Sequence, residues 1–222
     1  MLPPYDIEAM SIEVELALDW YAPVVARGNP SSGARMQFLA LWREILAPVL
    51  SQPTTWTLRD FHSPNLHWLA ERDGLKRLGL IDFQDAVLGP PAYDVASLLQ
   101  DARLEVPSDL ELRLLALYAR RRASSDPGFD PGAFTAGYAV MGAQRATKIL
   151  GLFTRLDRRD GKPQYLRLLP RIERTLAKNL AHPALESLRH WFAAHLPRAL
   201  GTGAGTAVAA GSEPVSTPAQ ES

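Results

Sequence analysis

The chain has 222 residues, of which 46% are hydrophobic and 22% charged, a balance typical of a globular domain with a sizeable core. Lysine plus arginine and aspartate plus glutamate both number 24, so no net charge attracts nucleic acid or an acidic membrane surface, and we expect neither as a partner. The sequence lacks cysteine, an apolar run of the roughly 18 residues that span a bilayer, and the pattern of a signal peptide, which favours a cytoplasmic protein without disulfide or thiolate chemistry.

Two helices are predicted before any strand. Residues 6–27 form the first, with Asp6 as its N-cap, because apolar residues recur there at helical spacing. Its expected core-facing stripe consists of Ile12, Leu16, Trp20 and Val24. Residues 27–33 contain Gly, Pro and Ser and interrupt the pattern, after which a second apolar stripe predicts a helix that Pro48 can bend. This second stripe consists of Phe38, Leu41, Trp42, Ile45 and Val49.

The middle of the chain is predicted to contain short strands. Residues 55–58, 66–69 and 77–81 are β-type runs separated by polar turns, and Asp73-Gly74 is the clearest turn signal. We therefore expect a small sheet that carries loops.

The chain is predicted to be helical again up to residue 196. The expected helices are residues 95–100, 109–123, 131–156, 163–180 and 184–196. Asp130 and Pro131 form a favourable cap and first-turn pair. Residues 198–222 consist largely of Gly, Ala, Ser, Thr and Pro and cannot bury enough apolar surface to offset their ordering entropy. We expect one domain over residues 1–197 and a disordered tail over residues 198–222.

Three polar residues fall on loops beside the predicted strands. They lie in the segments Leu58-Arg59-Asp60-Phe61-His62-Ser63-Pro64-Asn65-Leu66 and Leu80-Ile81-Asp82-Phe83-Gln84-Asp85. Phosphoryl transfer needs a carboxylate that accepts the proton of the attacking hydroxyl, and hard oxygen ligands that hold Mg²⁺ on the nucleotide phosphates. Asp60 suits the first task, and Asn65 and Asp82 suit the second. Asp and Asn are also common in turns, but their order here and the hairpin between them favour a kinase-type site.

These segments resemble the catalytic loop of the aminoglycoside phosphotransferase and choline-kinase-like family, commonly written His-Gly-Asp-x-His-x-x-Asn and followed by Ile-Asp-Phe. Asp60, His62, Asn65 and Asp82 occupy the motif positions. Residues 57–103 look most like the bacterial anomeric kinases of N-acetylmuramate and N-acetylglucosamine, and a looser similarity extends over residues 5–196. The resemblance implies an α+β, mainly α fold: the C-terminal lobe of a protein-kinase-like fold, with a small β element that carries the catalytic loop.

The resemblance also implies roles for the motif residues. Asp60 would be the catalytic base, Asn65 and Asp82 would bind the metal and through it the nucleotide, and His62 would organise the loop. The implied cofactors are ATP and Mg²⁺, and the implied acceptor is the anomeric hydroxyl of an amino sugar. An aminoglycoside, a choline-like alcohol or a hydroxylated amino acid is the alternative acceptor.

Two features depart from the family pattern. Leu58 and Arg59 stand where the family has a histidine before the catalytic aspartate, a residue that usually braces the backbone. The family's N-terminal lobe, with a lysine that pairs with the nucleotide phosphates, has no counterpart before Asp60, and no Gly-rich phosphate loop precedes it. We expect this lobe to be missing or to be supplied by a fused or partner domain. The competing hypothesis is a non-catalytic kinase-like remnant or regulatory binding module.

Further charged residues are candidates for support of the loop or the substrate. Arg59 can brace the loop or pair with a phosphorylated group, and Asp85 can approach the metal or the substrate. Asp94 is expected to cap the helix that starts at Val95 or to have another structural role, rather than to contact substrate. The long helix over residues 131–156 is expected to face the cleft with Gln144, Arg145 and Lys148, which are candidate substrate contacts.

Overall fold

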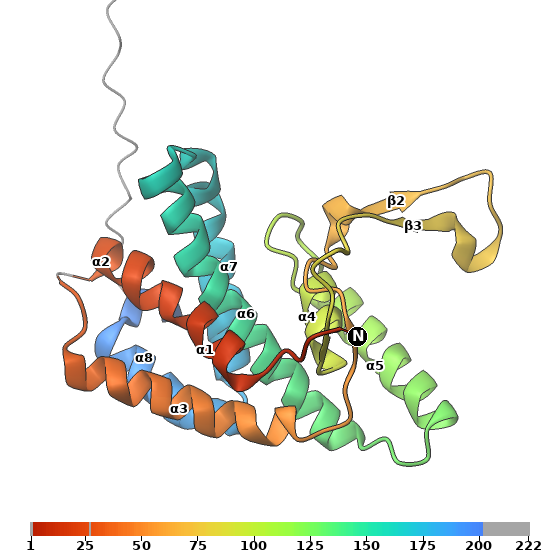
Figure 1. The fold of residues 1–222 in the computed structure, drawn as a ribbon, viewed down its shortest axis with the longest axis horizontal. Helices are drawn as coiled ribbons and strands as arrows, with labels where there is room; N and C mark the ends of the chain where they lie inside the picture. Colours follow the sequence, from red (N-terminus) through yellow and green to blue (C-terminus); the bar gives the residue numbers. More distant parts are fainter. Residues whose placement is uncertain (1, 27, 202–222) are drawn as a thin grey trace, which may run out of the picture.

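The computed structural model describes residues 2–26 and 28–201, and helices dominate it (Figure 1). Together with small antiparallel β elements they confirm the predicted α+β, mainly α class. The helices are α1 Ile7–Leu16, α2 Ala22–Val25, α3 Ser32–Leu50, α4 Ala92–Leu99, α5 Ser108–Ser125, α6 Pro131–Asp160, α7 Leu169–Leu180 and α8 Glu186–His195. The strands are β1 Thr55–Thr57, β2 Leu66–Trp68, β3 Leu78–Leu80 and β4 Val87–Gly89. Short 3-10 turns cover Ser63–Asn65, Gly74–Arg77, Pro163–Leu168, Pro183–Leu185 and Pro197–Leu200.

The first helix begins where predicted but buries a different face. The Asp6 carboxylate accepts a hydrogen bond from the Ala9 N–H at 2.9 Å, which makes Asp6 the N-cap. The side chains buried from this region are Met10, Val14, Ala17, Leu18 and Tyr21. Ile12, placed in the core by the sequence pattern, is 67% exposed, so the predicted stripe was wrong. Apolar residues occur on two faces of this helix, and its packing against α6 determines which of them is buried.

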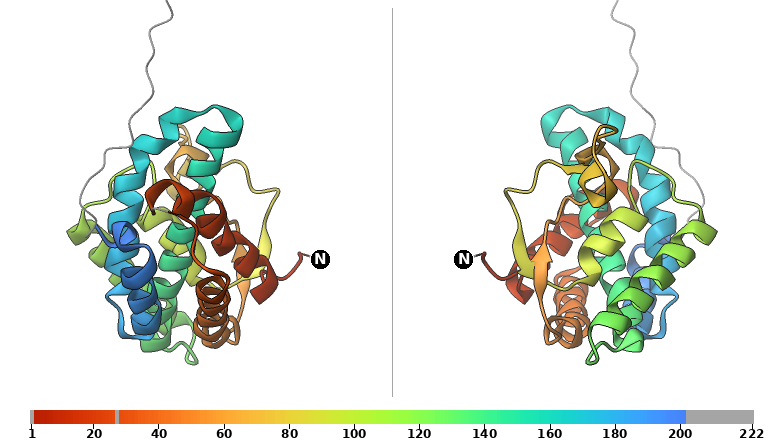
Figure 2. Two further views of the ribbon diagram at one scale, coloured as in Figure 1. Left: turned by 90° about the vertical axis from the view of Figure 1, so that its left-hand side faces the viewer. Right: turned by 90° about the vertical axis from the view of Figure 1, so that its right-hand side faces the viewer.

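The longest helix, α6, is the centre of the helical part. It contacts α1, α3, α4 and α7, and Figure 2 shows from both sides how these helices gather around it. The predicted cap is confirmed, because the Asp130 carboxylate accepts hydrogen bonds from Gly132 N at 2.8 Å and Ala133 N at 3.1 Å. The helix runs past the expected end at residue 156 and stops at Gly161, whose φ of 63° is left-handed.

Helices α1 and α6 touch backbone to backbone at Gly151. A Cβ atom at this position would lie 2.1 Å from the carbonyl carbon of Leu16 and 2.5 Å from the nitrogen of Ala17. The N-terminal helix changes here into the π-helical turn Ala17–Tyr21, which leads into α2. The absence of a side chain at Gly151 therefore sets how closely the N-terminal helix lies against α6.

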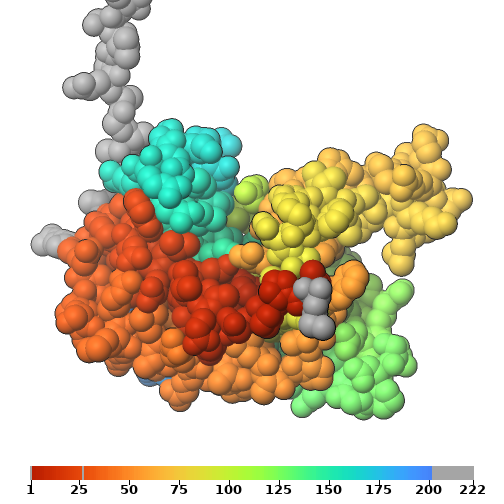
Figure 3. All heavy atoms as spheres, in the orientation of Figure 1, coloured from red at the N-terminus to blue at the C-terminus, as the bar shows by residue number. Residues whose placement is uncertain are grey.

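The β residues form two separate two-stranded elements in the described chain, not the single small sheet that was expected. β1 pairs with β4, with Thr57 opposite Val87, and Pro4 adds a parallel bridge to Leu88. β2 pairs with β3 in an antiparallel hairpin that extends away from the helices (Figures 1 and 3). The sequence analysis missed β4, which ends at Gly89 and is followed directly by Pro90 and Pro91.

The C-terminal helices follow the predicted order, with the start of the expected 163–180 helix wound as a 3-10 turn. Pro197–Leu200 form a further turn in which Ala199 is buried.

From residue 202 on, the expected disordered tail lies outside the described residues. Across residues 2–26 and 28–201, no helix is both long enough and apolar enough to cross a membrane.

Candidate active site

Pairing of β2 with β3 brings Asn65 and Asp82 together. Asn65 directly precedes β2 and Asp82 follows β3, and Leu66 pairs with Leu80 between them. The Asn65 Nδ2 atom donates hydrogen bonds to the backbone oxygen of Asp60 at 2.9 Å and to Asp82 Oδ2 at 3.4 Å. The three residues singled out in the sequence therefore meet at the base of the hairpin.

The three side chains differ in exposure and in bonding. Asn65 is buried, whereas Asp60 and Asp82 are exposed. Within the described residues, the Asp60 carboxylate forms no hydrogen bond or ion pair, which leaves its oxygens open to a ligand. Asp82 has a φ of 60°, a left-handed conformation that costs about 1 kcal/mol or more in a residue with a side chain. Backbone strain of this kind is concentrated at ligand sites.

The oxygen donors of Asn65 and Asp82 suit Mg²⁺. This ion prefers hard oxygen ligands and is usually held by one or two protein carboxylates, with phosphates and water completing its shell. The Asn65 amide nitrogen is engaged by two acceptors, which leaves its oxygen as the available ligand atom. In the described part of the chain, no cluster of three or more His, Cys, Asp and Glu could hold a metal alone. The pair therefore fits a metal that shares its ligands with a nucleotide.

Helix α4 supports the loop that carries Asp60. The Asp94 carboxylate accepts hydrogen bonds from the backbone N–H groups of Leu58 at 2.6 Å and Arg59 at 3.0 Å, and Ser97 Oγ donates to the Arg59 oxygen at 3.4 Å. Burial raises the pKa of Asp94, and the two backbone donors counteract this. Asp94 therefore has the structural role that was expected as one of two possibilities. It supports the loop instead of capping its own helix, because these loop N–H groups lie outside any strand ladder and take its carboxylate as their acceptor.

Arg59 has the geometry of a bracing residue. Its φ of 68° is left-handed, at the position where the motif quoted above has glycine. The guanidinium donates a hydrogen bond to Glu13 Oε1 at 2.7 Å and lies 5.3 Å from the centre of the Tyr5 ring. Burial opposes the charge, but the hydrogen bond and charge of Glu13 raise the pKa of Arg59. The residue before Asp60 is thus fixed from both its backbone and its side chain.

Glu13 connects the catalytic loop to two helices. Besides Arg59, its carboxylate accepts hydrogen bonds from Lys148 Nζ at 2.7 Å, from Gln144 Nε2 at 3.0 Å and from the Tyr5 hydroxyl. Burial works to raise the pKa of Glu13. The charge and hydrogen bond of Lys148 and the hydrogen bonds from Tyr5 and Gln144 outweigh burial and lower this pKa overall. Burial likewise opposes the charge of Lys148, whose pKa is nevertheless raised by Tyr93 and Glu13.

The sequence analysis missed Glu13, although a signal was present. The residue lies beside Val14 and three positions after Met10, on the face that α1 buries. A single carboxylate on an apolar helix face indicates a buried ion pair. The signal was lost because the other apolar stripe was chosen as the core face.

His62 is buried within the catalytic loop. Its backbone N–H donates to the oxygen of Asp60 at 3.0 Å, and its oxygen accepts from the Asn65 N–H at 2.9 Å. Burial lowers the pKa of His62, and the nearby charges of Arg103 and Arg145 lower it further. The charges of Asp101 and Asp60 act in the opposite direction but do not reverse this lowering of the pKa.

The rest of the loop and the remaining carboxylates complete the surroundings of the site. Asp101 Oδ2 accepts a hydrogen bond from the Ser63 N–H at 2.9 Å, which fixes the turn before Asn65. Asp85 is exposed and forms no hydrogen bond or ion pair with any described residue, which leaves its carboxylate accessible.

One hollow is lined by the loop, and a larger one is lined by Asp101, whose carboxylate contacts Ser63 of the loop. The smaller, about 50 Å³, is lined by Asp60 and His62 and by Arg145 and Lys148 of α6. Gln144, the third α6 residue singled out in the sequence, is fully buried and directed at Glu13 instead.

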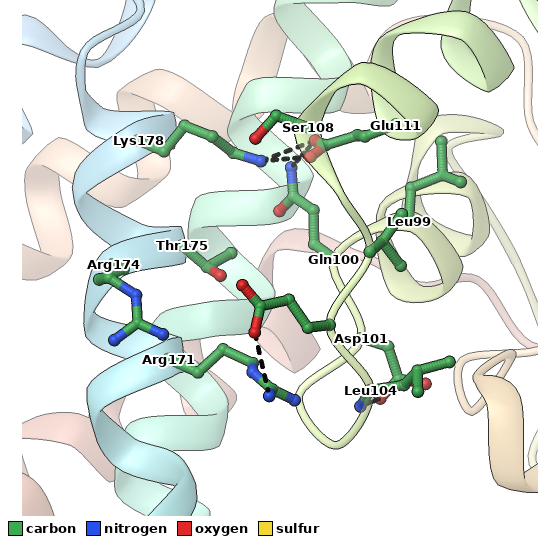
Figure 4. A pocket seen from close by; sticks show the side chains of 12 residues that line it. Leu99, Gln100, Asp101, Leu104, Ser108, Glu111, Arg171, Arg174, Thr175 and Lys178 are labelled. Carbon is green, nitrogen blue, oxygen red and sulfur yellow. Dashed lines mark hydrogen bonds and ion pairs between the residues drawn. The ribbon is translucent and has the colours of Figure 1, made fainter.

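The larger hollow, about 230 Å³, lies between α7 and the segment that follows α4 (Figure 4). Lys178 Nζ is 2.6 Å from Glu111 Oε2, and Arg171 is 3.6 Å from Glu105. These pairs neutralise most of the charge in its walls, which makes it a weaker candidate for binding an ionic substrate.

Residues 4–134 match the phosphotransferase enzyme family. The match covers more than half of the chain and includes Asp60, Asn65 and Asp82, so the chain belongs to this family, as the catalytic-loop motif indicated. Three similar proteins are each named N-acetylmuramate/N-acetylglucosamine kinase.

The similarity to these proteins extends over most of the chain. The protein of Caulobacter vibrioides is 39% identical over 193 residues, which are 87% of this chain and 52% of the relative. The protein of Neisseria meningitidis is 37% identical over 77% of this chain and 50% of its own length. That of Pseudomonas aeruginosa is 35% identical over 85% of this chain and 55% of its own length. The chain thus spans about half the length of the curated relatives it matches.

Proposed function

We propose that this chain forms the acceptor-binding and metal-binding part of an ATP-dependent kinase that phosphorylates the anomeric hydroxyl of an amino sugar. The observation that carries the proposal is the meeting of Asn65 and Asp82 beside an Asp60 carboxylate that has no partner among the described residues. Family membership supports the phosphotransferase class, and the names of the relatives support a sugar acceptor.

Asp60 is the proposed base of the reaction. Its carboxylate accepts a hydrogen bond from the acceptor hydroxyl and takes the proton as the hydroxyl oxygen attacks the terminal phosphorus of ATP. A bond forms between that oxygen and phosphorus while the bond from phosphorus to the departing ADP oxygen breaks. Asp94 and Glu13, through their bonds to the Leu58–Asp60 backbone and to Arg59, keep the base in position.

Asn65 and Asp82 are the proposed ligands of Mg²⁺. Bound there, the ion would supply positive charge to the nucleotide phosphates. The buried Asn65 amide is held by Asp60 and Asp82, which keeps its oxygen in place for the metal, whereas Asp82 would exchange its hydrogen bond from Gln84 for the ion.

The remaining contacts to the nucleotide are proposed to come from outside the matched region. The relatives are about twice as long as the segment that they share with this chain, and a fused or partner segment would supply the phosphate-binding lysine. We place the reaction in the cytoplasm, where ATP is abundant; the lack of cysteine is compatible with that compartment.

The test is the transfer of labelled phosphate from ATP to N-acetylglucosamine by the full-length gene product. We expect Asp60→Asn to lower turnover at least about 100-fold while ATP affinity stays within about twofold, because the base acts only in the chemical step. Asp73→Asn, in the exposed turn of the hairpin, is the control and should be unaffected. Equal turnover of Asp60→Asn and wild type would contradict the assignment of the base. Failure of the wild type to phosphorylate any amino sugar, alcohol or aminoglycoside would favour the binding-module hypothesis.

A further inference from the structure

The smaller hollow is formed by four separate parts of the chain. Asp60 and His62 come from the catalytic loop, Tyr93 from α4, Arg103 from the segment after α4, and Arg145 and Lys148 from α6. Its volume of about 50 Å³ is small beside the 230 Å³ of the larger hollow. A hollow of this size suits a side group of a ligand.

Positive charge in this hollow is largely unpaired. Arg145 is only 6% exposed, yet its guanidinium forms no hydrogen bond or ion pair with any residue that the structure describes. The Arg103 guanidinium also forms no ion pair in the described chain and lies 5.8 Å from the centre of the Phe153 ring. Lys148 alone has an acidic partner, Glu13 at 2.7 Å.

A largely buried arginine without a hydrogen-bonded partner is costly, because its charge has lost much of its water and is opposed only from a distance, by Asp94. Asp94 only partly balances the charge of Arg145. Burial raises the pKa of Asp94 and the charge of Arg145 lowers it, but both Asp94 oxygens are hydrogen-bonded to the backbone of Leu58 and Arg59. The charge of Arg145 is thus available to an external anion.

The hollow borders Asp60 but not the proposed metal ligands. Its lining includes neither Asn65 nor Asp82, although Asn65 contacts the Asp60 backbone. An anion bound by Arg145 would belong to the molecule whose hydroxyl faces Asp60.

We propose that Arg145, supported by Arg103, forms a subsite for a carboxylate carried by the acceptor sugar, next to the hydroxyl that Asp60 deprotonates. The inference rests on the proposed function. A guanidinium offers parallel N–H groups that match the two oxygens of a carboxylate. N-acetylmuramate carries such a group on its lactyl ether, whereas N-acetylglucosamine is neutral, so this pair of sugars isolates the contribution of the charge.

The test is isothermal titration calorimetry of the full-length gene product with each sugar, without nucleotide. The wild type is expected to bind N-acetylmuramate more tightly. Arg145→Met keeps the volume of the aliphatic stem but loses one charge-assisted contact. It should lower the affinity for N-acetylmuramate at least about tenfold and the affinity for N-acetylglucosamine less than about threefold. Arg103 is exposed, so Arg103→Gln should fold normally; it should weaken N-acetylmuramate by about threefold.

Arg174→Gln is the matched control, because Arg174 is an exposed arginine that lines the larger hollow (Figure 4). It should leave both affinities unchanged. Equal weakening of both sugars by Arg145→Met and by Arg103→Gln would overturn the carboxylate subsite in favour of a structural role. If Arg145→Met instead loses affinity for ATP or phosphate while its preference between the two sugars is intact, the charge of Arg145 serves the nucleotide. That result would also overturn the carboxylate subsite.

Phosphate transfer to neutral N-acetylglucosamine separates this inference from the proposed function. If the wild type phosphorylates N-acetylglucosamine but shows no preference for the carboxylate sugar, the subsite alone is refuted. If neither sugar is phosphorylated, the proposed kinase function fails.

Discussion

Glu13 shows how much of this site depends on one buried carboxylate that touches no substrate. It receives hydrogen bonds from Tyr5, from Arg59 in the catalytic loop, and from Gln144 and Lys148 on α6. Its side chain is 12% exposed, so these bonds operate in an environment where charge is poorly screened.

Glu13→Gln should destabilise the fold by about 2 to 4 kcal/mol at pH 7, because the charges of Arg59 and Lys148 would remain without their partner. The lowered pKa of Glu13 sets the sign of the pH dependence: the stabilisation is complete above the ordinary carboxyl range and is lost as pH falls through the lower folded-state value. Urea unfolding at pH 7, 5 and 4 should show the difference between variant and wild type shrinking with acidity.

Glu15→Gln provides the control for this measurement on the same helix. Glu15 lies 3.5 Å from Arg35 and is about one third exposed, and such surface pairs contribute less than about 1 kcal/mol. A Glu13→Gln difference that stays constant between pH 7 and pH 4 would contradict the assigned ionisation.

Asp82 is the residue through which metal binding is most directly tested. Asp82→Ala should lower the Mg²⁺-dependent part of ATP binding at least about tenfold, because a carboxylate ligand is lost. Asp73→Ala, on the exposed turn of the same hairpin, should have no effect. Fluorescence titration of ATP at increasing Mg²⁺ measures this, and the same Mg²⁺ dependence in both variants would argue against Asp82 as a ligand.

Among the helices, the crossing of α1 and α6 at Gly151 controls the geometry behind the loop. Gly in a helix interior costs about 1 kcal/mol of stability relative to Ala. At position 151 the closeness of the Leu16 backbone explains why glycine is present despite this cost. Because Glu13 lies one turn before this crossing, a change in spacing would also displace its bonds to α6.

Gly151→Ala should destabilise the protein by at least about 2 kcal/mol, since the added methyl group overlaps the backbone of Leu16 and Ala17 and forces the helices apart. Gly33→Ala is the control within α3, where the nearest atom to a new Cβ is 3.9 Å away. That substitution should be neutral or stabilising by up to about 1 kcal/mol. Thermal unfolding measures both, and similar melting temperatures for the two variants would contradict the close-contact explanation.

For the whole molecule, the projecting hairpin presents an apolar face. The register places Leu66 opposite Leu80 and Trp68 opposite Leu78, so these four side chains share one side of the hairpin. Trp68 is 70% exposed, and Leu78 and Leu80 are 43% and 40% exposed. An exposed apolar face of this kind promotes association.

A protein of these 222 residues should therefore self-associate as its concentration rises, which sedimentation velocity would detect. Replacing Leu78 and Leu80 together by Thr retains β propensity but removes apolar surface, and should shift the protein toward monomer. His67→Thr, on the opposite side of β2, should leave association unchanged. Association that persists in the double variant would exclude this face as its cause.

The sequence alone determined the class of the fold and the location of the candidate site. Helix caps such as Asp6 and Asp130, the short strands and the Asp60–Asn65–Asp82 set depend on neighbours a few residues away or on one hairpin, so local patterns are sufficient to predict them. The family motif added roles that spacing could not supply.

Only the tertiary structure decided which face of α1 is buried, which residue braces the loop, and where unpaired charge collects. Glu13 and Lys148 are 135 positions apart, and Asp94 binds a loop 36 residues before it. Contacts at such separations depend on how whole elements pack, and α1 offered two apolar faces of similar quality. The charge of Arg145 is likewise ordinary in the sequence and becomes informative only where burial removes its water and no carboxylate replaces it.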